Sequence, residues 1–120
     1  MITAIAYNLL VSGVSTIPDR AVTSREAEAF RLHAELCKVL TDPKRLMILQ
    51  ALRSGERSVG DLAELVGISL PNASQHLSVM RHSGLVGTRR DRTTVFYSLA
   101  EPRIAQACDI VHQIALERLR

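Results

Sequence analysis

Apolar residues recur at helical spacing in the segment 69–84, SLPNASQHLSVMRHSG. The apolar positions are Leu70, Ala73, Leu77 and Met80. Because they are three or four residues apart, they predict a helix with one buried face. The opposite face carries short amide and hydroxyl side chains, where a surface helix usually carries charged ones. The pattern therefore raises the question of what this neutral polar face contacts.

Capping signals predict further helices before this segment. Thr23 and Glu26 have the spacing of a capping box, so a helix is expected to begin here and to end near residue 40. Asp42 and Pro43 suit the cap and the first position of a second helix. That short helix is expected to stop at Gly55.

A third helix joins the segment 69–84 to form a helix-turn-helix. Ser58 and Asp61 have the spacing of another capping box, and Gly67 is expected to end the helix that they open. Ser69 can cap the following helix, which tolerates a proline in its first turn. Two short helices joined by a brief turn that contains glycine are typical of this motif.

The pattern changes from helix to strand after Leu85. The runs LVGTRR and TTVFYSL are β-branched and aromatic, and they flank the polar tip 90–93, so a two-stranded hairpin is expected. Pro102 can open a last helix whose apolar face includes Cys108 and Val111. The predicted fold class is mainly α with a β-hairpin, in the order of four helices, a hairpin and a helix.

The length of 120 residues suits one domain with one modest core. Residues 1–22 are mostly apolar, and we expect an N-terminal arm or an extra helix there, followed by one domain over 23–120. Residues 1–18 lack the basic start of a signal peptide and the long unbroken apolar run of a membrane span. We therefore expect a cytoplasmic protein with no membrane partner.

Positive charge is concentrated directly after the polar helix. Between Arg81 and Arg92 the chain carries four arginines and one aspartate, a net charge of +3 that equals the formal charge of the whole chain. Such a basic cluster beside a polar helix indicates a nucleic-acid-binding surface. The alternative is a solvated helix whose neighbouring arginines serve only solubility.

The second helix of a helix-turn-helix lies in the major groove of DNA. Short amide and hydroxyl side chains can bond base edges there, whereas arginines on a neighbouring hairpin would hold phosphates or enter the minor groove. The polar face is therefore predicted to contact double-stranded DNA. For Asn72 the alternative is support of the first helical turn, and for His76 it is packing against the hairpin.

The segment 40–99, with its motifs DPxRLxIL, SQHL and the arginine-rich hairpin before FYSL, resembles the ArsR/SmtB family of winged-helix repressors. The resemblance covers about residues 30–115. It implies a winged helix-turn-helix DNA-binding and dimerisation domain over 23–120, homodimeric through its first and last helices. It also implies repression at an operator until an inducer binds. The two-fold symmetry of a dimer predicts an inverted-repeat operator.

The family pattern also implies particular DNA contacts. Base contacts are expected at Ser69, Asn72, Ser74, Gln75 and His76. Phosphate contacts are expected from the second helix of the helix-turn-helix, called the recognition helix, at Ser78 and Arg81. They are also expected from the hairpin, called the wing, at Arg89, Arg90 and Arg92.

The residues do not match the family's familiar metal sites. The helix before the recognition helix reads SVGDLAEL and has no thiol, and no histidine follows His112 in the last helix. Asp109 and His112 share a helix face, but two ligands per chain make a weak site even with Cys108 added across a dimer. No cofactor is predicted apart from a thiophilic metal ion at such a site.

Two cysteines, Cys37 and Cys108, lie 71 positions apart, one on each helix expected at the dimer interface. They are either small apolar residues of those helices, or a thiol switch that a disulfide, a polysulfide or a soft metal would bridge. No glycine-rich phosphate loop or spacing of nucleophile and base indicates an enzyme. A regulator without an inducer site of its own, and a winged-helix module that binds protein, remain alternatives.

Overall fold

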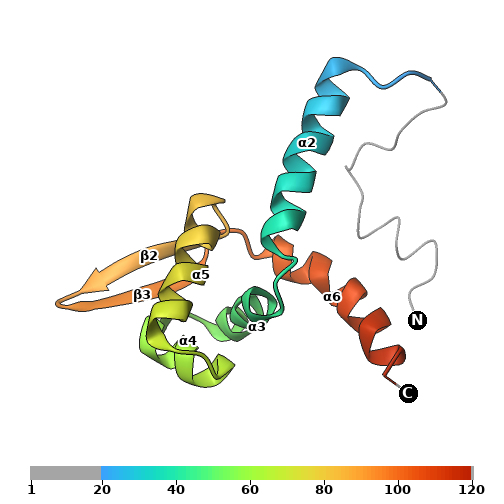
Figure 1. Ribbon diagram of the computed structural model, residues 1–120. Coiled ribbons are helices and arrows are strands. Elements are labelled where there is room, and N and C mark those ends of the chain that lie inside the picture. The colour runs from blue at the N-terminus through green and yellow to red at the C-terminus, as the bar shows by residue number, and fades with distance from the viewer. Residues whose placement is uncertain (1–19, 120) are drawn as a thin grey trace. The chain divides into compact units, whose positions relative to one another are not determined.

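The structure is a computed structural model that describes residues 20–119, and the chain divides into two compact units with the boundary after His33. The arm or extra helix expected over residues 1–22 lies outside the described residues, apart from 20–22. In chain order the elements are α2 (Ser24–Val39), α3 (Pro43–Ala51), the 3-10 turn η1 (Leu52–Ser54), β1 (Arg57–Ser58), α4 (Val59–Val66), α5 (Leu70–His82), β2 (Val86–Asp91), β3 (Thr94–Leu99) and α6 (Arg103–Glu117) (Figure 1).

The predicted capping box opens α2. The Glu26 N–H donates to Thr23 Oγ1 at 3.2 Å, and the Thr23 N–H donates to the Glu26 carboxylate at 2.7 Å. Arg20 pairs with the same carboxylate at 2.8 Å. The backbone N–H of Thr23, and then Arg20, hold the pKa of Glu26 below its ordinary value. None of the residues of α2 is buried, so the predicted apolar stripe through Phe30 and Cys37 is exposed in the single chain.

The helix α3 begins as the sequence predicts. The Asp42 carboxylate accepts the backbone N–H groups of Lys44 at 2.8 Å and Arg45 at 3.3 Å, and Pro43 occupies the first turn. Pro43 needs no hydrogen-bond partner there because it has no N–H. The helix tightens into η1 and stops at Gly55, whose φ of 135° favours glycine.

The helix-turn-helix is confirmed in α4 and α5. Ser58 Oγ accepts the Asp61 N–H at 3.1 Å and caps α4. Gly67 ends α4 in the left-handed region, at φ 73° and ψ 41°, where a residue with a Cβ atom is strained. Ser69 Oγ then accepts the Asn72 N–H at 3.3 Å and opens α5.

The hairpin of β2 and β3 is confirmed, but the sheet has three strands in the order β1-β3-β2. The prediction of a two-stranded sheet was therefore incomplete. In β1, Arg57 lies opposite Tyr97 and Ser58 lies opposite Phe96. A strand of two residues has no alternating pattern to reveal it, and Ser58 also caps the next helix.

One core holds the helix-turn-helix together. The largest fully buried side chains come from α3, α4 and α5 and are Ile48, Leu49, Leu62, Leu77 and Met80. Ala105 brings α6 to the same cluster. Figure 1 shows α3, α4 and α5 beside one another, with β2 and β3 extending past α5. Among the described helices, none is long and apolar enough to cross a membrane.

The buried face of α5 differs from the prediction at one position. Leu77 has no exposed surface, whereas Leu70, predicted to be buried on the same face, is 53% exposed. Leu70 lies in the first turn of α5, directly after the cap. The helical spacing of apolar residues therefore begins one turn before the part of α5 that packs on the core.

The two leucines give a matched test of this core. Replacing Leu77 by alanine leaves a cavity and should lower the free energy of unfolding by about 2–5 kcal/mol. Leu70→Ala should change it by less than about 0.5 kcal/mol because that side chain is largely exposed. Denaturant unfolding at one fixed protein concentration measures both. Equal losses in the two variants would contradict the packing of α5.

Candidate nucleic-acid interface

The polar face of α5 is open to solvent. The buried residues of the helix lie on the opposite side, against the core, and are Ala73, Leu77 and Met80. The residues predicted to contact DNA that are exposed here are Ser69, Asn72, Ser74, Gln75, Ser78 and Arg81. The Ser69 hydroxyl also caps the helix, so its oxygen already accepts one hydrogen bond. The fold thus presents this row of amide and hydroxyl groups outward from one helix.

His76 is an exception on this helix because its ring is turned toward α3. Its Nδ1 accepts a hydrogen bond from Arg45 Nε at 3.1 Å, and its Nε2 lies 4.0 Å from the Asp42 carboxylate. The side chain is 20% exposed. The partners of His76 thus lie in α3 and its cap, whereas the alternative had named the hairpin. A base contact would require the ring to give up these partners.

Arg45 connects the recognition helix to the end of α2. Besides its bond to His76, it donates through Nη1 to the Val39 carbonyl at 3.1 Å. Sequence reasoning missed this residue, although it is part of the DPxRLxIL motif. No local spacing could place it beside a residue 31 positions further along the chain.

Arg89, one of the three predicted wing contacts, is occupied within the protein. Its guanidinium donates to both carboxylate oxygens of Glu56, at 3.1 and 2.5 Å, and lies 4.8 Å from the centre of the Phe96 ring. The hydrogen bond from Arg89 holds the pKa of Glu56 below its ordinary value. This ion pair cancels most of the charge that Arg89 would offer to a phosphate.

The other two wing arginines keep their charge available. Arg90 and Arg92 are exposed, and neither has an ion-pair partner within residues 20–119. Side chains alternate along β2, so Arg90 shares a sheet face with buried Val86, on the side where β2 contacts α5. Arg92 stands at the tip of the hairpin with φ 58°. Both arginines are therefore open to a phosphate, and Asp91 between them lowers the net charge of the tip.

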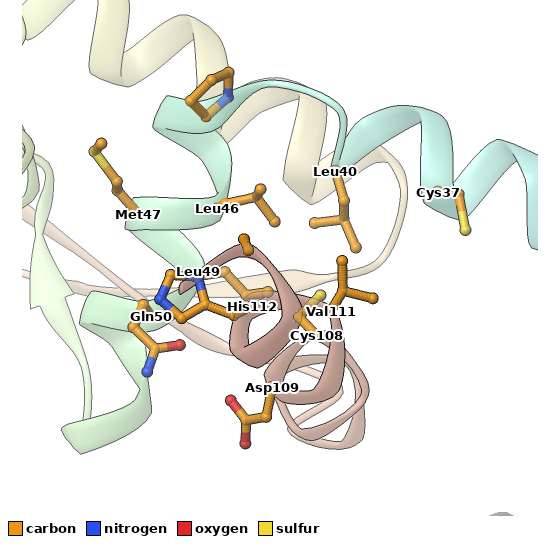
Figure 2. Close-up of a pocket in the computed structure, with 12 residues that line it drawn as sticks. Cys37, Leu40, Leu46, Met47, Leu49, Gln50, Cys108, Asp109, Val111 and His112 are labelled. Atoms are coloured by element: carbon orange, nitrogen blue, oxygen red, sulfur yellow. The ribbon is translucent and has the colours of Figure 1, made fainter. Parts of the chain in front are cut away.

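Both cysteines are free thiols that line one cavity of about 540 Å³, with Cys37 on α2 and Cys108 on α6 (Figure 2). Cys37 is exposed and Cys108 is partly buried. Burial raises the pKa of the Cys108 thiol, and the charges of Asp109 and Cys37 raise it further. The sequence could not show that the two thiols share a cavity, because it does not reveal how α2 and α6 meet.

The weak metal candidate of Cys108, Asp109 and His112 is not assembled within the described chain. Across residues 20–119, no group of three histidine, cysteine or acidic side chains is arranged to hold a metal ion. Asp109 binds Arg53 of η1 instead, in an ion pair that raises the pKa of the arginine. His112 lies at the cavity wall on the exposed part of α6.

Comparison with known proteins identifies the family. Residues 42–88 match the family of bacterial regulatory proteins of the arsR type. The biofilm growth-associated repressor of Xylella fastidiosa is 40% identical over 100 residues, which span 83% of this chain and 87% of that protein. NolR from Sinorhizobium fredii has a similar structure, with a TM-score of 0.71 and 35% identity over 79% of this chain and 95% of that one.

A third relative is the homodimeric winged helix-turn-helix DNA-binding domain of an ArsR-type regulator from Mycobacterium bovis. Its structure has a TM-score of 0.70 and 32% identity, covering 86% of this chain and 94% of that one. The fold agrees with that of these relatives. The chain belongs to the ArsR family, and it is a winged helix-turn-helix transcriptional regulator that binds DNA, not an enzyme.

Proposed function

We propose that this chain is a cytoplasmic homodimeric repressor that binds an inverted-repeat operator. One observation carries the proposal: α5 exposes a row of amide and hydroxyl groups, and the hairpin in contact with this helix exposes Arg90 and Arg92, which have no ion-pair partner within residues 20–119. Amide and hydroxyl groups suit base edges, and the arginines suit phosphates. Repression is supported by the repressor among its relatives.

Dimerisation is supported by apolar side chains that the single chain leaves uncovered. The exposed apolar residues of α2 and α6 include Phe30, Leu32, Ile114 and Leu116. Monomeric proteins rarely leave such a collection in water, and a two-fold axis would cover it with the same surface of a second copy. A dimer would place two recognition helices on one side, so half-site centres should be about 10 bp apart or a multiple of this.

Sedimentation tests the dimer. The wild-type chain should sediment as a dimer at micromolar concentration, and Ile114→Asp should weaken dimerisation at least about tenfold, or about 1.4 kcal/mol. The control is Gln113→Asp, which adds the same charge at the neighbouring exposed position and removes no apolar surface. A wild-type chain that stays monomeric would contradict the proposed assembly.

Base contacts and phosphate contacts can be separated by gel shift on the region upstream of the gene. Gln75→Ala should cost about 1–3 kcal/mol on the operator and little on random DNA, because it removes an amide that reads base edges. Arg90→Ala should weaken both complexes alike and reduce the salt slope by about 0.9, because one phosphate contact is lost.

Arg89 provides the matched control for the wing. Arg89→Ala should reduce the salt slope less than Arg90→Ala does, because Glu56 already neutralises Arg89. If Gln75→Ala and Arg90→Ala lost specificity equally, the assignment of base contacts to the helix and phosphate contacts to the wing would be wrong. Equal salt slopes for the two arginine variants would contradict only the role of the Glu56 pair.

A thiol switch is a second candidate function, favoured by the shared cavity of Cys37 and Cys108. In a disulfide switch, the two thiols would pass two electrons and two protons to a small-molecule disulfide such as oxidised glutathione. The raised pKa of Cys108 keeps this thiol protonated near neutral pH, which makes it a slow nucleophile. This observation favours the alternative, in which both cysteines line the cavity and have no sensing role.

Cysteine variants decide between the two roles. If the cysteines form a switch, a small-molecule disulfide, a polysulfide or a thiophilic metal should weaken operator binding by the wild type. The same reagent should not change operator binding by Cys37→Ser or Cys108→Ser. Each reagent is added separately in the gel shift. If the wild type and both variants respond alike to every reagent, the cysteines are not sensors.

A further inference from the structure

The cavity that the two cysteines line has a mostly apolar wall. It lies between the end of α2, α3 and α6, and its volume of about 540 Å³ falls in the range of small-molecule sites. The apolar wall is made of Leu40, Leu46, Met47, Leu49, Val111 and Ala115. Leu49 is buried beneath it, and Figure 2 shows Leu40, Leu46 and Val111 around the same space.

Polar groups are few in this wall, and the acidic one is already compensated. Asp109 is paired with Arg53, which neutralises its charge. Burial keeps the Cys108 thiol in its uncharged form. Gln50 and His112 remain as hydrogen-bonding groups on neighbouring parts of the wall (Figure 2). The lining therefore suits an uncharged molecule with one or two polar atoms, because a charged ligand would find no free counter-charge.

The cavity wall is connected to the recognition helix by hydrogen bonds and not by proximity alone. Leu40 and Cys37 belong to the wall, and the Leu40 N–H donates to the Cys37 carbonyl at 3.0 Å in the last turn of α2. The carbonyl of Val39, within that turn, accepts Arg45. Arg45 in turn holds His76 of α5. A ligand that displaces this turn would thus change the support of the recognition helix.

We propose that this cavity binds a small, uncharged, mostly apolar molecule, and that its occupancy alters operator affinity through Arg45. The effector role rests on the proposed function, whereas binding to the cavity does not. The cavity is a hollow in one chain of a size suited to a small molecule. A second copy that fills it instead is an outcome of the test.

Two related fluorescent probes test binding without DNA. N-phenyl-1-naphthylamine is uncharged, and 1-anilinonaphthalene-8-sulfonate has the same rings with one negative charge. The full chain should bind the uncharged probe more tightly. Ala115→Phe, which fills the cavity, should weaken that binding at least about tenfold. Ala107→Phe is the control, because it adds the same ring to an exposed position of α6 outside the cavity.

Three results would overturn the binding site. The first is a wild-type chain that does not bind the uncharged probe, as it would not if a second copy filled the cavity. The second is equal affinity for the two probes. The third is equal binding by Ala115→Phe and Ala107→Phe, which would place the probe elsewhere.

The coupling to DNA is measured by gel shift with saturating N-phenyl-1-naphthylamine. The probe should change operator affinity of the wild type at least about threefold, a modest allosteric coupling. Arg45→Lys should still bind the probe but lose this response, because a single ammonium nitrogen cannot reproduce the separate Nε and Nη1 bonds to His76 and the Val39 carbonyl. Probe binding without any change in operator affinity would overturn the effector role. Failure to bind the operator without probe would overturn the proposed function and leave the cavity result intact.

Discussion

Burial of one face of α5 is the constraint on which the rest of this structure depends. Leu77 and Met80 pack without exposed surface against Ile48 of α3 and Leu62 of α4. Because a helix turns every 3.6 residues, fixing these two positions fixes the direction of every other side chain on α5. The exposed polar row is therefore a consequence of core packing. The left-handed turn at Gly67 and the cap at Ser69 set where that face begins.

Electrostatics then decides which arginines can act on DNA. A count of charges along the sequence treats Arg89 and Arg90 as equivalent, but β2 sends them to opposite faces of the sheet. Arg89 stacks on Phe96 and pairs with Glu56, so it stiffens the base of the wing. Arg90 is exposed and has no ion-pair partner within residues 20–119. The wing thus uses one cation for its own structure, and its neighbours Arg90 and Arg92 are the proposed phosphate contacts.

Local signals made most of the fold predictable. The caps at Thr23, Asp42, Ser58 and Ser69 depend on residues within three positions, and all four are present in the structure. The features that the sequence could not reveal are long-range. Strand β1 forms only because Tyr97 and Phe96 offer it an edge, and His76 turns inward only because Arg45 stands opposite. The cavity likewise depends on where α6 crosses α3.

The helix α3 lies between two surfaces of the protein, and its residues contact both. Arg45 and Ile48, three positions apart, face the recognition helix, whereas Leu46, Met47 and Gln50 line the cavity. A close-packed helix of nine residues cannot change shape on one side alone, so a small rotation alters both surfaces together. The Arg53–Asp109 pair ties the end of this segment to α6. Interactions at α6 and at the DNA surface are therefore joined through one short rigid element.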